Sequence, residues 1–204
     1  MKSTPLPKLI DISTELTGAP VYPGDPIPSL SRIKDIEKGD DYNLSLLSTG
    51  LHAGTHIDAP SHFIAEGKSV DEIDVSSFIG PCRVIKATGY LTGAWIDELY
   101  LYKCDRLLIK GEGMGKLDSS AAEELIASGV KLVGIDTNTI GMPKHEDEVH
   151  RILLNGGCTI LEGLNLSEVE PDDYYLFAFP IKIAGAEAAP CRAVLAKDYI
   201  IWNK

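Results

Sequence analysis

Apolar residues along this chain fall mostly in short runs that turn residues interrupt. Runs rich in Val, Ile, Leu and aromatic residues, bounded by Gly, Pro, Asn or Asp, are typical of β-strands. Such runs predict strands over residues 8–16, 42–49, 81–87, 105–111, 131–136, 158–164, 174–183 and 192–202. Apolar residues at helical spacing predict helices over residues 93–101, 119–129 and 149–157. We therefore expect a β-rich α/β protein.

The clearest unit is the helix at 119–129 followed by the strand at 131–136. Asp118 or Ser119 can cap the helix, and Gly129 suits the left-handed residue that ends one. The strand KLVGID is almost wholly apolar, as expected of a buried strand. A helix followed closely by such a strand favours a parallel pairing in the sheet.

A Pro- and Gly-rich segment over residues 18–28 interrupts the pattern early in the chain. Its four prolines exclude regular structure there. We find no repeat, low-complexity tract or linker in the sequence. At 204 residues the chain can bury a sizeable core, so we expect a single domain over residues 1–204.

Composition narrows the range of partners. The formal net charge of -11 at pH 7 argues against nucleic acid and against an anionic membrane surface, because both need a basic face. No apolar run suits a signal peptide or a membrane span, so we expect neither. Four cysteines without a CxxC pair are expected to be reduced thiols of a cytoplasmic protein. They are Cys82, Cys104, Cys158 and Cys191.

Three of the five histidines fall within residues 52–63, which read HAGTHIDAPSHF. Two imidazoles and a carboxylate, from His52, His56 and Asp58, suit a divalent metal ion. Such donors favour zinc, or manganese where oxygen ligands dominate. His62 is then left over for proton transfer. The segment predicts a metal site with an acid–base group beside it.

A second set of donors lies later in the chain. His150 is expected to open the helix at 149–157, and Glu162 ends the strand-like run that follows. Apolar neighbours draw the Glu162 carboxylate inward, and a buried carboxylate is costly unless it is paired or binds a metal. Five donors support one or two ions, the second sharing a bridging carboxylate with the first. By contrast, His145 is expected to be solvated and Asp136 to cap a turn.

These segments resemble a known family. The motif HxGTHxDxPxHF, here at residues 52–63, is the signature of the cyclase-like metal-dependent hydrolases, which include bacterial kynurenine formamidase and isatin hydrolase. Residues 11–26, 150–166 and 185–195 are similar to that family as well, so the resemblance covers nearly the whole chain. It implies a swivelling β/β/α fold within the α/β class. It also implies a homo-oligomer, a dimer or a tetramer, with sites near subunit contacts.

Carried over residue by residue, the resemblance implies two metal positions. The ligands would be His52, His56 and Asp58 for the first ion, and Asp58, His150 and Glu162 for the second. His62 would transfer protons rather than bind metal. The chain departs from the formamidases at residues 136–143, where DTNTIGMP replaces a loop containing Pro-Ser. This loop is expected to help form the substrate pocket, so the substrate can differ while the metal chemistry stays the same.

The donors and the resemblance together lead to one main hypothesis. A divalent ion would lower the pKa of a water molecule, and the activated water would hydrolyse an amide bond of a small molecule. The substrate would be an N-formylkynurenine-like arylformamide or a small cyclic amide. His62 would accept a proton from that water or return one to the leaving nitrogen. Two alternatives stay open: a metal-dependent cyclase or lyase acting on a small carbonyl compound, and a non-catalytic binding module that a metal ion stabilises.

Overall fold

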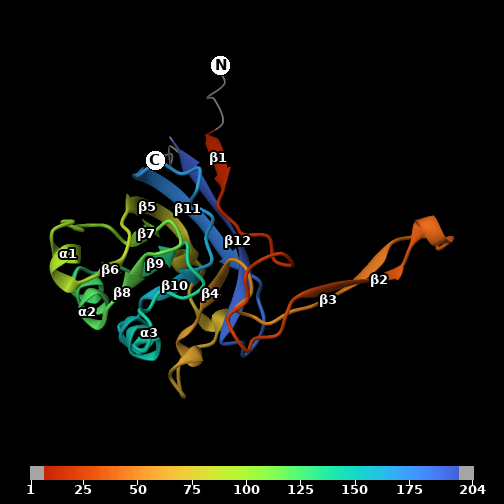
Figure 1. The fold of residues 1–204 in the computed structure, drawn as a ribbon, viewed down its shortest axis with the longest axis horizontal. Coiled ribbons are helices and arrows are strands. Elements are labelled where there is room, and N and C mark those ends of the chain that lie inside the picture. The colour runs from red at the N-terminus through yellow and green to blue at the C-terminus, as the bar shows by residue number, and fades with distance from the viewer. Residues whose placement is uncertain (1–6, 198–204) are drawn as a thin grey trace.

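The computed structural model describes residues 7–197, and at its centre is a closed barrel of seven strands (Figure 1). The spatial order is β12 (Ala188–Lys197), β11 (Asp172–Pro180), β5 (Ile79–Lys86), β7 (Arg106–Lys110), β9 (Leu132–Ile135), β10 (Thr159–Glu162) and β4 (His56–Asp58). The long strand β12 closes the ring, because its first residues pair with β4. Its last residues pair with β1 (Lys8–Asp11), which lies outside the ring.

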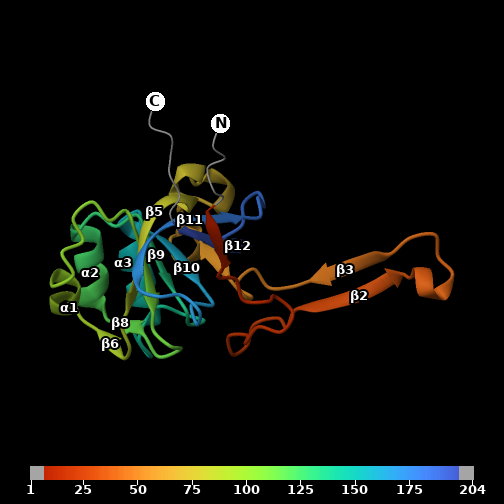
Figure 2. The same cartoon turned by 90° about the horizontal axis from the view of Figure 1, so that it is seen from above.

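The strands β5, β7, β9 and β10 run parallel to one another, as the helix-then-strand pattern predicted. Each connection between them contains one helix, because parallel neighbours need a long crossover. The three helices lie side by side on one outer face of these strands (Figures 1 and 2). They are α1 (Gly93–Asp97), α2 (Ser119–Ala127) and α3 (Glu146–Asn155). The predicted α/β class is confirmed.

The remaining elements are short. β6 (Tyr90–Leu91) and β8 (Lys116–Leu117) form a small parallel pair beside the helices. Four single turns of 3-10 helix complete the described elements: η1 (Ile36–Lys38), η2 (Pro60–His62), η3 (Val70–Glu72) and η4 (Val75–Phe78).

Neighbouring residues of the central strands point into two different apolar layers. Leu107 and Val133 pack beneath the helices together with Leu125 of α2. Their neighbours Leu108 and Leu132 face the barrel interior. Because both faces are buried, these strands read as continuous apolar runs in the sequence.

A β-hairpin projects from the barrel (Figures 1 and 2). We call residues 29–48 the arm; it consists of β2 (Ser29–Lys34) and β3 (Leu44–Ser48), paired antiparallel around η1. The predicted strand at 42–49 is therefore present, but it belongs to the arm and not to the main sheet. Its partner β2 was not predicted.

Several boundaries differ from the prediction. The strand predicted over residues 8–16 ends at Asp11. The helix at 149–157 begins earlier, at Glu146, so His150 lies in its second turn and does not open it. The helix at 93–101 ends at Asp97. The last strand covers residues 188–197, and the part of the prediction beyond 197 lies outside the described residues. Within residues 7–197, no helix combines the length and the apolar character that crossing a membrane requires.

Candidate metal centre

The short strand β4 brings His56 and Asp58 to the same face of the barrel wall. Residues two apart on a strand point to the same side, and the residue between them, Ile57, packs into the barrel interior. β10 pairs antiparallel with β4 so that Glu162 lies directly opposite His56. Three donor side chains thus come from two neighbouring strands, which fix their spacing.

Three histidines reach the same place from surrounding segments. His150 lies on α3, which packs against the sheet. His52 lies in the loop before β4, and His62 ends η2, the 3-10 turn that Pro60 begins. The structure therefore brings together every residue that the sequence singled out as a metal ligand or proton carrier.

The donors form two groups that share Asp58. In the first group, Asp58 Oδ1 lies 2.9 Å from His52 Nδ1 and 3.4 Å from His56 Nε2. In the second, Asp58 Oδ2 lies 3.6 Å from His150 Nε2, which is 3.2 Å from Glu162 Oε1. Each carboxylate oxygen of Asp58 thus faces one group, which is the arrangement that a bridging ligand needs.

Main-chain carbonyls fix the orientation of two of the imidazole rings. His56 Nδ1 donates to Gly54 O at 3.0 Å, and His150 Nδ1 donates to Glu146 O at 2.7 Å. A carbonyl oxygen can only accept, so in both rings Nδ1 carries the hydrogen. A neutral ring then keeps its Nε2 lone pair free, and both Nε2 atoms point toward the carboxylates. Such outer contacts are typical of histidines that bind metal ions.

Three buried polar atoms of this cluster lie within ion-pair distance of one another's side chains but make no well-formed hydrogen bond within the part of the chain that the structure describes. They are His56 Nε2, Asp58 Oδ1 and Asp58 Oδ2. Burying a polar atom without a partner is costly, so native proteins rarely leave one in that state. A divalent cation between these atoms would satisfy all three, and the donor set therefore fits a metal ion.

Opposite charges outweigh burial in setting the protonation of the cluster. Burial lowers the pKa of His56, but the Asp58 and Glu162 carboxylates raise it to about 10. Burial likewise lowers the pKa of His150, and the same two carboxylates raise it to about 9. Burial would raise the pKa of Asp58, yet His52 and His56 hold it well below its usual value. In the metal-free protein, protonated imidazoles balance the carboxylates, and a cation can take over that role.

His62 stands beside the two groups and belongs to neither. Its ring centroid lies 4.1 Å from that of His52 and 4.3 Å from that of Phe63. Burial lowers the pKa of His62, while the Asp58 carboxylate opposes that shift. A neutral imidazole in this place is able to accept a proton.

A cavity of about 220 Å³ opens onto these side chains. Its volume exceeds the roughly 150 Å³ that suffices for a benzene ring. Tyr22 Oη donates to Glu146 Oε2 at 2.7 Å, and Asn138 Nδ2 donates to Pro20 O at 3.1 Å. These bonds hold the Pro-rich segment against the cavity. The lining residues are Tyr22, Asp25, His52, His62, Phe63, Asn138, Thr139, Glu146, Asp147, His150 and Glu162.

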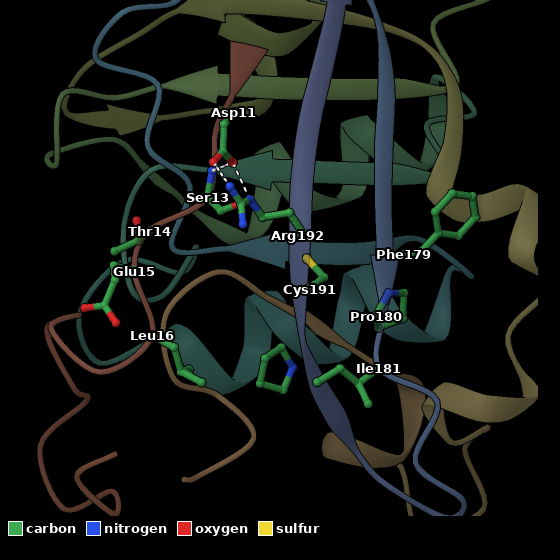
Figure 3. Close-up of a pocket in the computed structure, with 11 residues that line it drawn as sticks. Asp11, Ser13, Thr14, Glu15, Leu16, Phe179, Pro180, Ile181, Cys191 and Arg192 are labelled. Atoms are coloured by element: carbon green, nitrogen blue, oxygen red, sulfur yellow. Dashed lines mark hydrogen bonds and ion pairs between the residues drawn. The ribbon is translucent and has the colours of Figure 1, made fainter. Parts of the chain in front are cut away.

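A larger cavity, of about 730 Å³, lies beside β11, β12 and the segment after β1 (Figure 3). Figure 3 shows Asp11 and Arg192 paired on one side of it, with Arg192 Nε 2.9 Å from Asp11 Oδ1. Phe179 and Ile181 lie on the other side. No histidine lines this cavity, so the smaller one is the candidate site.

His145 and Asp136, which the sequence analysis did not count as metal ligands, lie outside the two donor groups. His145 is exposed and has its Nδ1 3.2 Å from Glu148 Oε2. Asp136 accepts from the backbone N–H groups of Gly111 and Glu112, both at 2.9 Å. It therefore caps a turn, as expected, although the turn is the one after β7.

Sequence reasoning missed two residues that contact the donor side chains. Glu187 has its Oε1 3.7 Å from His52 Nε2, and the Ile140 N–H donates to Glu162 Oε1 at 2.7 Å. Glu187 lies in the segment 185–195 that resembles the family, which was an available signal. The contact of Ile140 is made by its backbone and leaves no mark in the sequence.

Sequence comparison relates the chain to a family of known proteins. The model of the family described as "Putative cyclase" matches residues 10–141, more than half of the chain. The kynurenine formamidase of Delftia acidovorans is 35% identical over 202 residues, which cover 92% of this chain and 97% of the relative. This likeness confirms the expected enzyme class, that of metal-dependent amidohydrolases.

Several solved structures have the same overall fold as this chain. One described as a potential metal-dependent hydrolase with cyclase activity has a TM-score of 0.83 at 28% identity, covering 95% of this chain and 99% of the other. Isatin hydrolase A from Labrenzia aggregata, bound to benzyl benzoate, has a TM-score of 0.82 at 22% identity and covers 93% of both chains. At that identity it supports the fold alone. The expected fold type is confirmed, and by its sequence and its barrel the chain belongs to the cyclase family.

Proposed function

We propose that the protein hydrolyses an amide bond of a small molecule, an N-formylkynurenine-like arylformamide or a small cyclic amide. The observation that carries the proposal is the pair of donor groups that share Asp58 beside a small cavity. The name of a similar protein, kynurenine formamidase, supports the arylformamide. Phe63 and Tyr22 in the cavity wall suit an aromatic substrate.

In this proposal the donor groups are metal ligands. They are His52, His56 and Asp58 for one ion, and Asp58, His150 and Glu162 for a second. Mixed imidazole and carboxylate donors favour zinc, with manganese as the second choice. When bound, a divalent ion would supply a Lewis acid for the amide carbonyl and an acidified water.

His62 moves the proton in the proposed reaction. It lines the cavity, and its lowered pKa keeps the ring neutral near pH 7. The ring accepts the proton of the attacking water and passes it to the nitrogen that departs. The proton is needed there because an amine is a poor leaving group until it is protonated.

The test is an activity screen on the full chain loaded with zinc or manganese. N-formylkynurenine, isatin and simple formanilides are offered in ¹⁸O-labelled water. We expect turnover of at least one of them, with one labelled oxygen in the acid that forms. Asp58→Asn, nearly the same size but uncharged, is the matched control and should be inactive. A fully loaded protein that cleaves none of these amides would contradict the proposal.

The same assay covers the cyclase or lyase alternative. One structural relative is described as having cyclase activity, which is the observation in favour of that reading. A lyase or a cyclase would convert a small carbonyl compound without taking oxygen from water. Products that carry no label would therefore favour the alternative.

We also propose that the enzyme works as a homo-oligomer, a dimer or a tetramer. The arm exposes apolar side chains that its own chain does not cover: Leu30, Ile33, Leu44, Leu46 and Leu47. An apolar surface of this kind marks a contact with another protein chain.

We further propose that the protein is cytoplasmic. This location fits the free thiols of its four cysteines, which are Cys82, Cys104, Cys158 and Cys191.

A further inference from the structure

A peptide group in the loop after β9 holds the carboxylate of Glu162. This group joins Thr139 to Ile140, and its N–H donates to Glu162 Oε1 at 2.7 Å. Its carbonyl oxygen accepts from Thr137 Oγ1 at 2.8 Å and also from Lys116 Nζ. A peptide group is planar and rigid, so donors that fix the carbonyl also fix the direction of the N–H.

Lys116 is in an unusual position for a lysine. It is half-buried on the short strand β8, next to Leu117, which is completely buried. Withdrawing an ammonium group from water is costly unless a partner compensates it. Within the described residues, the hydrogen-bond partner of Nζ is the carbonyl of Thr139 and not a carboxylate.

The contact between Lys116 and the Thr139 carbonyl affects the hydrogen bond at the other end of the same peptide group. A cation at the carbonyl end polarises the peptide group, and hydrogen bonds that follow one another in a chain strengthen each other. The N–H at the other end faces the negative charge of Glu162. The ammonium of Lys116 therefore reinforces the bond that orients the carboxylate toward His150, 3.2 Å away, and His56, 3.5 Å away.

We propose that Lys116 is a positioning residue for the second donor group, acting on Glu162 through the peptide between Thr139 and Ile140. The inference rests on the proposed function only in taking Glu162 as a metal ligand. The first group lacks Glu162. Loss of Lys116 therefore weakens one of the two metal-binding steps and spares the other.

The test is a calorimetric titration of the metal-free full chain with zinc, comparing the wild type with three variants. Lys116→Met removes the charge and keeps the length, and we expect it to weaken one binding step about 10- to 100-fold, as loss of an outer-shell contact typically does. Glu162→Gln should weaken the same step. Lys116→Arg keeps a cationic donor and should restore much of the affinity. Lys131→Met, at an exposed lysine paired with Asp105, is the matched control and should bind zinc as the wild type does.

Three results would overturn the inference. The first is a Lys116→Met protein that binds zinc like the wild type in every step. The second is an equal loss in all steps together with a lower melting temperature of the metal-free protein, because Lys116 would then only fasten the loop. If the wild type shows one step and Glu162→Gln leaves it unchanged, the second group does not bind zinc and the inference also fails.

Two variants of Thr137, the other side chain that donates to the Thr139 carbonyl, test the same peptide group. Thr137→Val removes the hydroxyl with little change in shape, and Thr137→Ser retains it. We expect the valine variant to weaken the step that Lys116→Met weakens, and the serine variant to bind normally. A protein that takes up zinc in both steps but hydrolyses no amide would refute the proposed function and leave this inference intact.

Discussion

Asp58 offers one carboxylate oxygen to each donor group, so both groups depend on it. We expect Asp58→Ala to lose nearly all bound metal, whereas Glu162→Ala should lose only the ion of the second group. Elemental analysis of the purified variants gives both values. Normal metal content in Asp58→Ala would show that the two groups do not share this ligand.

His62 lines the cavity without belonging to either donor group. His62→Ala should therefore keep its metal content and lose turnover by a factor of about 10² to 10⁴, the usual contribution of a general acid–base group. Metal analysis and steady-state kinetics are measured on the same preparation. Loss of metal would make His62 a ligand, and unchanged turnover would leave it without a role in the reaction.

The raised pKa values of His56 and His150 make the metal-free protein sensitive to alkaline pH. Folding raises the pKa of His56 from 6.5 to about 10 and that of His150 to about 9. The stability that these protonated rings contribute is complete below pH 6.5 and is lost as the pH rises through their folded-state values. We expect the melting temperature of the metal-free protein to fall between pH 7 and pH 10.

The metal-loaded protein is the control for this pH series. A bound ion requires neutral imidazoles, so loading near pH 7 should release protons, and affinity should rise with pH. Calorimetry in two buffers of different ionisation enthalpy measures the protons released. A metal-free protein whose melting temperature stays level up to pH 10 would contradict the assigned protonation.

The residues of the site differ in how far the sequence could reveal them. His52, His56 and Asp58 lie within one short motif, so their proximity could be predicted. Glu162 stood out because a carboxylate among apolar neighbours needs a partner. The carbonyl of Gly54 and the N–H of Ile140 could not be found in this way, because any residue type carries the same backbone groups.

At the scale of elements, Gly163 lets β10 approach the segment before β4. It has a positive φ of 66°, and a Cβ there would lie 2.2 Å from Gly54 O. We expect Gly163→Ala to lower the free energy of unfolding by roughly 2–5 kcal/mol, from left-handed strain and the clash together. Because the clash separates Glu162 from His56, metal uptake should fall as well.

Gly157 provides the matched control for this substitution. Its φ is 78°, but a Cβ there would meet no atom within 4 Å. Gly157→Ala should therefore show only the backbone strain, about 1–2 kcal/mol, with normal metal content. Chemical denaturation measures both variants, and equal losses would show that the contact with Gly54 does not matter.

Helices and strands could be predicted where the capping residues and the apolar pattern agreed, and they were missed where these signals were absent or in conflict. The helix α2 has an N-cap, Asp118, and a left-handed Gly129 at its end, and both were visible in the sequence. The first turn of α3 is acidic and lay outside the predicted helix, although acidic residues favour the start of a helix. The strand β2 was missed because both faces of the arm are exposed, so no regular alternation marks it.

At the scale of the whole molecule, we expect the exposed apolar side chains of the arm to decide the oligomeric state. Leu46 is 58% exposed on β3, and Leu46→Lys should shift the protein toward a monomer near 22 kDa in light scattering. Tyr102→Lys is the control, because Tyr102 is 82% exposed outside the arm. A wild-type protein that is monomeric at working concentration would contradict the proposed oligomer.

The closed ring also bears on aggregation. A closed barrel has no free strand edge to which another chain can add. Outside the ring, β1 offers an edge of four residues that begins with Lys8 and ends with Asp11, and charged residues discourage such pairing. The longer open edges, with their leucines, belong to β2 and β3 in the arm. Fibres or precipitates should therefore grow by strand addition at the arm, while the barrel and its donor groups stay folded.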